Sequence, residues 1–151
     1  MLHRIADAKL GYDAQPLQGK KALVVGIANK DSIAYGCARA FRAGGAEIAI
    51  TYLNEKAKRF TDPCAAALDV DDVLNMELDV TKAGQLAAVV DNITDRWGRL
   101  DILVHAIAFA PLADLHGRVT DCSQLGFQTM MDISVHSLIR MARAVEPLMT
   151  E

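Results

Sequence analysis

Residues 22–36 read Ala-Leu-Val-Val-Gly-Ile-Ala-Asn-Lys-Asp-Ser-Ile-Ala-Tyr-Gly, and this stretch decides the fold. The wholly apolar run Ala22–Val25 is typical of a strand buried on both faces, as in a parallel sheet. Gly26 ends the run and allows a sharp turn, because it has no Cβ. A helix is expected over Asp31–Ala43, closed by the pair of glycines that follows. The stretch therefore predicts a strand, a loop and a helix in direct succession.

The same alternation continues through the rest of the sequence. Further strands are predicted over Glu47–Tyr52, Val73–Leu78 and Ile102–Val104. A helix is expected over Asn54–Leu68, with a break or restart at Pro63. A second is expected from a Thr81 cap to about Trp97, with Gly98 closing it. A third is expected from Ser123 to about Met149. Alternating strands and helices predict an α/β fold, a Rossmann-type doubly wound parallel sheet in strand order 3-2-1-4.

The length of 151 residues suits one domain. We expect residues 18–151 to form a dinucleotide-binding domain and residues 1–17 to be an N-terminal extension. A complete fold of this type would continue past residue 151, so the domain is predicted to be incomplete, truncated before its fifth strand. The fourth strand would then form an apolar edge of the sheet.

Charge and cysteine content exclude several other classes of protein. Sixteen Lys and Arg against nineteen Asp and Glu give a net charge of −3, which disfavours nucleic acid as a partner. Cys37, Cys64 and Cys122 are odd in number and far apart, so neither a disulfide framework nor a zinc site is expected, and no metal is assigned. No apolar run suits a signal peptide or a membrane span, and we therefore predict a cytoplasmic protein.

The turn after the first strand is suited to binding a pyrophosphate. Gly26 lets the backbone approach closely, and the following helix directs its free N–H groups and positive dipole end at the phosphates. Ser32 either caps that helix or donates its hydroxyl to a phosphate oxygen, and the sequence leaves both roles open. Glu47 stands where the shorter G-x-G-x-x-G fingerprint expects a ribose-binding carboxylate. Because Glu47 begins the second strand instead of ending it, we reject it as a ribose ligand.

The run Gly26-x5-Ser-Ile-Ala-Tyr-Gly36 resembles the cofactor loop of the bacterial NADH-dependent enoyl-acyl carrier protein reductases, divergent members of the short-chain dehydrogenase/reductase superfamily. The resemblance extends over residues 18–151. The further segments that agree in order and spacing are Gly45–Tyr52, Leu78–Val80, Leu103–Pro111, Asp132–Ser134 and Met141–Ala144.

The resemblance implies which residues contact the adenine half of the cofactor. Gly26, Ser32 and Ile33 would contact the pyrophosphate and the adjoining ribose. Asp79 and Val80 would bracket the adenine, with the Asp79 carboxylate accepting from the exocyclic amine. The alternative for Asp79 is a loop residue that helps to start the next helix.

The resemblance also implies positions around the reacting end of the cofactor. Ile107 would pack near the nicotinamide, and Ala110 would lie at the mouth of the acyl site. We expect His105 to be a core histidine with satisfied hydrogen bonds beneath the site, and not an acid or base. Ser134, at the position of the active-site Asn of ordinary short-chain dehydrogenases, is expected to have a supporting role in its helix.

One departure from the family concerns the choice of cofactor. Leu53 occupies the position of a frequent Gln that contacts the adenine ribose, and it cannot hydrogen-bond. Lys56, Lys58 and Arg59 lie nearby and would attract a 2′-phosphate, unless they form a solvated helix face. The cofactor implied is therefore NAD, as NADH, with NADPH left open.

The resemblance implies reduction of an acyl-carrier-protein-linked trans-2-enoyl thioester in fatty-acid biosynthesis, by hydride transfer from NAD(P)H. In that family a Tyr-x6-Lys pair handles the proton and the ribose, but Tyr12, Tyr35 and Tyr52 are not followed by Lys at that spacing. No catalytic residue is therefore assigned, and we expect the isolated chain to bind dinucleotide weakly and to be inactive. The alternatives are a carbonyl-reducing short-chain dehydrogenase and a non-catalytic nucleotide-binding module. The apolar surface of the last helix predicts a homo-oligomer, a tetramer as in the parent family.

Overall fold

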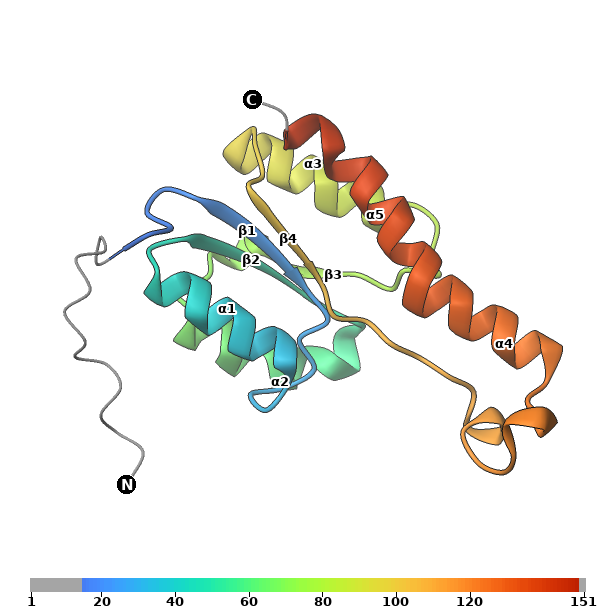
Figure 1. Cartoon of the computed structure of the whole chain (residues 1–151). Coiled ribbons are helices and arrows are strands. Elements are labelled where there is room, and N and C mark those ends of the chain that lie inside the picture. Colours follow the sequence, from blue (N-terminus) through green and yellow to red (C-terminus); the bar gives the residue numbers. More distant parts are fainter. Residues whose placement is uncertain (1–14, 150–151) are drawn as a thin grey trace, which may run out of the picture.

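The computed structural model describes residues 15–149 and forms a parallel sheet with helices on both faces (Figure 1). Its strands are β1 (Lys21–Val25), β2 (Glu47–Tyr52), β3 (Asn75–Glu77) and β4 (Ile102–His105). Its α-helices are α1 (Ile33–Ala43), α2 (Glu55–Ala67), α3 (Gln85–Trp97), α4 (Gln124–Met131) and α5 (Ser137–Val145). The strands lie in the order β3-β2-β1-β4, which confirms the predicted fold class.

The central strand β1 separates two hydrophobic cores. Ala22 and Val24 pack against α1 and α2 on one face, whereas Leu23 and Val25 pack against α3 and α5 on the other (Figure 1). Successive side chains of a strand point to opposite faces, so a strand covered on both sides must be apolar throughout. This explains the unbroken apolar run that the sequence shows here.

The proline in α2 does not break the helix, so the expected break or restart at Pro63 is wrong. Proline removes one intrahelical hydrogen bond, but packing on both sides of it maintains the turn. Thr61 and Cys64 are buried against the sheet, and their side chains donate to the carbonyl oxygens of Lys58 and Phe60, at 3.1 and 3.5 Å. Tertiary packing therefore outweighs the local preference.

The region around β3 differs from the sequence prediction at both of its ends. Asp71 caps a short 3-10 turn, Asp72–Leu74, by accepting from the backbone N–H of Val73, and this turn takes up the expected start of the strand. Thr81 does not cap α3, because its hydroxyl donates to Asp79 instead. The helix begins after Gly84, whose φ of +83° suits a residue without a Cβ. Gly98 closes α3 as predicted.

The last predicted helix is one helical rod with a wider turn inside it. Ser123 caps α4, a π turn over Asp132–His136 follows, and α5 continues the rod. The rod packs beside α3 at its carboxyl end, and the loop before it reaches away from the sheet (Figure 1). The rod exposes several large apolar side chains, namely Leu125, Phe127, Met131, Val135, Leu138 and Ile139. The rod therefore presents an uncovered apolar surface.

The predicted N-terminal extension falls largely outside the described residues, which begin at residue 15. Its last residue, Leu17, donates its N–H to the carbonyl oxygen of Gly44 at 2.7 Å and packs against the core under α1 and α2. Within residues 15–149, no helix has the length and apolar character needed to cross a membrane.

Candidate functional site

The turn after β1 lies directly against the loop that follows β4. Gly26 has a φ of +103°, and a Cβ placed on it would lie 2.2 Å from the carbonyl oxygen of Ala106. The backbone N–H of Ala106 in turn donates to the carbonyl oxygen of Val25 at 2.9 Å. Gly26 is therefore required by contact with a segment 80 positions away, in addition to the turn for which the sequence predicted it.

Ser32 caps α1. Its hydroxyl oxygen accepts from the backbone N–H of Tyr35 at 3.4 Å, and the hydroxyl donates to the carbonyl oxygen of Asn29 at 2.7 Å. The structure thus shows the capping role, one of the two roles that the sequence left open. Ile33, the first residue of the helix, is 84% exposed. The first N–H groups of a helix have no intrahelical partner, so this end of α1 presents donors and a positive dipole end to solvent.

The region after β2 begins with an exposed residue, and an open hollow lies between the first loop and α2. Leu53 follows the strand directly and is 54% exposed. The hollow, about 450 Å³, is lined by Asn29, Lys30, Asp31 and Tyr35 from the first loop and α1, and by Arg59, Phe60, Pro63 and Cys64 from α2. Lys58 is not among the lining residues, and its ammonium group pairs with Asp62 at 3.4 Å. Of the three basic residues singled out from the sequence, Arg59 is the one that lines it.

The loop after β3 is folded by its own acidic residue. The Oδ1 atom of Asp79 accepts from the Thr81 hydroxyl at 2.6 Å and from the Thr81 N–H at 2.9 Å. The hydrogen bond from the Thr81 hydroxyl lowers the pKa of Asp79, which keeps the carboxylate ionised and an acceptor. The adjacent carbonyl of Val80 accepts from Arg140 at 3.2 Å.

The segment after β4 is fastened to the helical rod. His105 Nε2 lies 2.6 Å from the hydroxyl oxygen of Ser137, whose own proton goes to the carbonyl oxygen of Ile133 at 2.6 Å, so His105 donates. Burial lowers the pKa of His105 below its ordinary value and favours this neutral form. His105 is half-buried and its Nε2 has a hydrogen-bond partner, which agrees with the prediction of a packed histidine beneath the site.

Ser134 joins its helix to the segment after β4, whereas the sequence predicted a supporting role within the helix. Its hydroxyl oxygen accepts from the N–H of Phe109 at 3.0 Å, and the hydroxyl donates to the carbonyl oxygen of the same residue at 3.2 Å. Ile107 lies in the chain between His105 and Phe109, which are both hydrogen-bonded to the helical rod. It is half-buried against the core under α3 and α5. Ala110 follows them on the way out to the extended loop and is also half-buried.

The predicted site residues all follow the carboxyl ends of the four strands, which meet at one edge of a parallel sheet. Gly26 lies against Ala106, the chain neighbour of Ile107, whereas Asp79 and Val80 follow β3, which lies on the far side of β2. Glu47 begins β2 at the opposite edge and pairs with Lys21, in agreement with its rejection as a ribose ligand.

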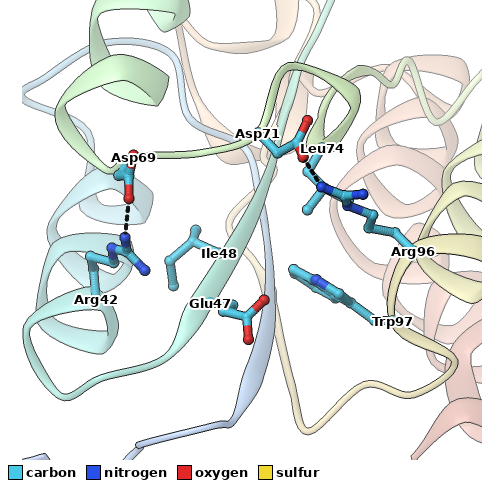
Figure 2. Close-up of a pocket in the computed structure, with 8 residues that line it drawn as sticks. All are labelled: Arg42, Glu47, Ile48, Asp69, Asp71, Leu74, Arg96 and Trp97. Atoms are coloured by element: carbon cyan, nitrogen blue, oxygen red, sulfur yellow. Dashed lines mark hydrogen bonds and ion pairs between the residues drawn. The ribbon is translucent and has the colours of Figure 1, made fainter.

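That opposite edge holds a separate cavity of about 140 Å³ (Figure 2). Figure 2 shows Arg42 paired with Asp69 on one side and Arg96 paired with Asp71 on the other, with Trp97 between the elements. These residues come from the carboxyl ends of helices and the amino ends of strands. Ligands of open α/β sheets bind outside the carboxyl ends of the strands, so this cavity is not the candidate site.

The strand order reverses between β1 and β4, and the Gly26–Ala106 contact marks that switch point. A glycine turn and an exposed helix N-terminus at a switch point are typical of α/β proteins of the Rossmann type, the class to which this fold belongs. Residues 26–151 match the family model described as "Enoyl-(Acyl carrier protein) reductase". The chain belongs to the enoyl-(acyl carrier protein) reductase family.

Individual relatives agree with this assignment. The chain is 43% identical over 136 residues to the enoyl-[acyl-carrier-protein] reductase [NADH] FabI of Nostoc, covering 89% of this chain and 53% of that protein. The crystal structure of the Aquifex aeolicus enzyme matches with a TM-score of 0.84 and 41% identity, over 88% of this chain and 52% of that one. The Anaplasma phagocytophilum enzyme, in complex with NAD, matches with a TM-score of 0.85 and 40% identity, over 91% and 52%. The chain spans about half the length of the relatives it matches.

Proposed function

We propose that the chain is the cofactor-binding part of an NADH-dependent enoyl-acyl carrier protein reductase of fatty-acid biosynthesis. The whole protein would transfer a hydride from NADH to a trans-2-enoyl thioester carried by acyl carrier protein. The observation that carries the proposal is the Gly26 turn, fitted against Ala106 at the switch point of a sheet that belongs to this family. Two relatives are named as NADH enzymes, and a third is described in complex with NAD.

The residues at this edge fit the adenine half of a dinucleotide. Gly26 leaves room for close approach of a pyrophosphate, and the N-terminus of α1 at Ser32 and Ile33 would supply N–H donors to it. At the adenine, the ionised Asp79 carboxylate would accept from the exocyclic amine, with Val80 against the ring. When bound, NADH supplies the hydride, and these residues hold and orient it.

The nicotinamide end of the cofactor would lie along the segment after β4. We place Ile107 beside the nicotinamide and Ala110 at the mouth of the acyl site, because both follow a strand next to the switch point. The proposal assigns no catalytic residue within the 151 residues, since the Tyr-x6-Lys pattern does not occur in them.

Leu53 and Arg59 bear on the choice between NADH and NADPH. Leu53 offers no hydrogen bond to an adenine ribose, and Arg59 lines the hollow between the first loop and α2, where a 2′-phosphate would have a cationic neighbour. We nevertheless propose NADH, because two relatives that are 43% and 41% identical over most of this chain are named for it. The same relatives favour enoyl reduction over the carbonyl-reducing and non-catalytic alternatives.

We also propose that the protein forms a homo-oligomer, a tetramer as expected for the family, in the cytoplasm. The many exposed large apolar side chains of the helical rod support assembly, because burying them against another copy would be favourable. The three cysteines are all free, which suits a reducing compartment. A strictly monomeric whole protein in light scattering would contradict the assembly.

Cofactor binding is tested by titrating the folded chain with NADH and following nicotinamide fluorescence. We expect saturable binding that Ser32→Ala weakens by about tenfold, because the helix end whose N–H groups would hold the pyrophosphate loses its cap, which is worth about 0.5–2 kcal/mol. Ser123→Ala is the matched control, since Ser123 caps α4 in the same way, at 2.9 Å from the N–H of Gly126, away from the cofactor edge. We expect its NADH affinity to equal that of the unchanged chain.

A folded chain without saturable NADH binding, or an equal loss of affinity in both serine variants, would contradict the cofactor site. Enoyl reduction by the whole protein is tested separately by the loss of NADH absorbance with a trans-2-enoyl thioester. Turnover of a ketone or aldehyde in place of the enoyl thioester would favour the carbonyl-reducing alternative.

A further inference from the structure

Three polar side chains on the helical rod each reach a loop at the cofactor edge of the sheet. They are Ser134, Ser137 and Arg140, at a constant spacing of three residues, which we call the loop-holding face. Ser134 contacts Phe109, Ser137 contacts His105, and Arg140 contacts Val80. All three lie on one continuous helical rod, so a single element fastens two loops that come from different strands.

The two serines fasten the segment that contains Ile107 at both of its ends. His105 is bound at 2.6 Å before it, and Phe109 is bound after it through both its N–H and its carbonyl oxygen. The main chain of Phe109 is therefore fixed in position and in orientation. A segment held on both sides in this way cannot shift without breaking a hydrogen bond to the rod.

The π turn makes the Ser137 contact possible. The backbone N–H of Ser137 donates to the carbonyl oxygen of Asp132, five residues back, so the hydroxyl takes the place of an α-helical N–H at the carbonyl of Ile133. Ser137 is 1% exposed, and its remaining acceptor capacity is used by His105. The Ser137 hydroxyl therefore hydrogen-bonds at the same time to a carbonyl oxygen of its own helix and to the side chain of His105 at the end of β4.

Arg140 fastens the loop on the other side of the site. One guanidinium nitrogen, Nη2, donates to the carbonyl oxygen of Val80 at 3.2 Å, whereas Nη1 donates to Asp132 Oδ1 at 2.6 Å and lies 2.8 Å from His136 Nδ1. The hydrogen bond from Arg140 lowers the pKa of Asp132, so the anchor is a charged pair. The guanidinium is held from the rod side and directed at the loop of Asp79 and Val80.

We propose that Ser134, Ser137 and Arg140 are positioning residues that set the two ends of the cofactor site relative to one another. Ser134 and Ser137 hold the segment at the nicotinamide end, and Arg140 holds the loop at the adenine end. The inference rests on the proposed function, because that function supplies the two ends. It goes beyond that function by assigning separate anchoring residues to each end of the site. It predicts that binding at each end can be weakened independently of the other.

The test compares NADH with AMP, which occupies the adenine end alone, in chemical-shift titrations of the folded chain. We expect Ser134→Ala to weaken NADH by about fivefold to tenfold and to leave AMP unchanged, because one hydroxyl with two hydrogen bonds is lost at the other end. Arg140→Met is expected to weaken AMP and NADH by a similar factor. Ser134→Thr keeps a hydroxyl and should restore NADH affinity.

Thr129→Ala serves as the matched control on the same rod, since its hydroxyl donates within the helix, to the carbonyl oxygen of Leu125 at 2.9 Å. It should change neither affinity. Equal weakening of AMP and NADH by Ser134→Ala, or no weakening of AMP by Arg140→Met, would overturn the inference while the cofactor site stands. A folded, unchanged chain that binds neither ligand would overturn the proposed function, and the inference with it.

Discussion

Replacing Gly26 by alanine tests the contact that joins the first and fourth loops. The added Cβ would lie 2.2 Å from the carbonyl oxygen of Ala106, whereas ordinary contact begins at 3.4 Å, so a gap of 3.4 − 2.2 = 1.2 Å must open. Ala106 cannot retreat freely, because its N–H is bonded to Val25 and its neighbours are fastened to the helical rod. Overpacking costs about 1–3 kcal/mol. The φ of +103° adds about 1–3 kcal/mol of backbone strain.

The free energy of unfolding should therefore fall by about 2–6 kcal/mol, which lowers Tm by at least about 4 °C for a chain of this size. Thermal unfolding followed by circular dichroism measures the shift. Gly36→Ala is the matched control, because Gly36 lies within α1 with nothing within 4 Å of the added Cβ. It should raise stability by about 0.5–1 kcal/mol. A Gly26→Ala chain that melts within about 1 °C of the unchanged chain would refute the reasoning.

Two further predictions concern the core histidine and the proline in α2. Because burial lowers the pKa of His105, the unfolded chain binds its proton more readily, so the free energy of unfolding should fall as pH drops below about 6.5, until the lowered pKa is reached. Urea unfolding across this range should show a shallower pH dependence for His105→Gln, and an identical dependence would contradict the prediction. Pro63→Ala restores an N–H donor inside α2 and should stabilise the chain by up to about 3 kcal/mol in thermal unfolding. A lower melting temperature would count against it.

The sequence predicted those features that depend on neighbours along the chain. The apolar run of β1, the glycine pair after α1 and the Gly98 cap each follow from local preference, and the order of the strands follows from their alternation with helices. The break at Pro63 and the cap at Thr81 were wrong, because in both cases a tertiary or loop contact outweighed the local signal. The predicted start of the third strand at Val73 was also wrong, because Asp71 caps a 3-10 turn there.

The contacts that shape the candidate site depend on pairs of residues far apart in the chain. The residues around Gly26 do not indicate that Ala106 will lie against it. In the same way, the sequence around Ser137 does not indicate that its hydroxyl will contact His105. The only signal for the loop-holding face is the spacing of three between its members, which many helices share. The residues expected to contact the cofactor stay predictions, although the fold brings them to one edge of the sheet.

The two-sided core of β1 has a consequence for how the strand is aligned with its neighbours. A slip by one residue would exchange the side chains of its two faces, yet both faces would remain apolar, so burial alone penalises the slip weakly. The alignment must therefore be fixed at the two ends. At the start, Asp101 accepts from the Lys21 N–H at 2.8 Å, and at the finish only Gly26 can lie against Ala106. The glycine at the cofactor edge thus also acts as a stop that prevents misalignment of the whole sheet.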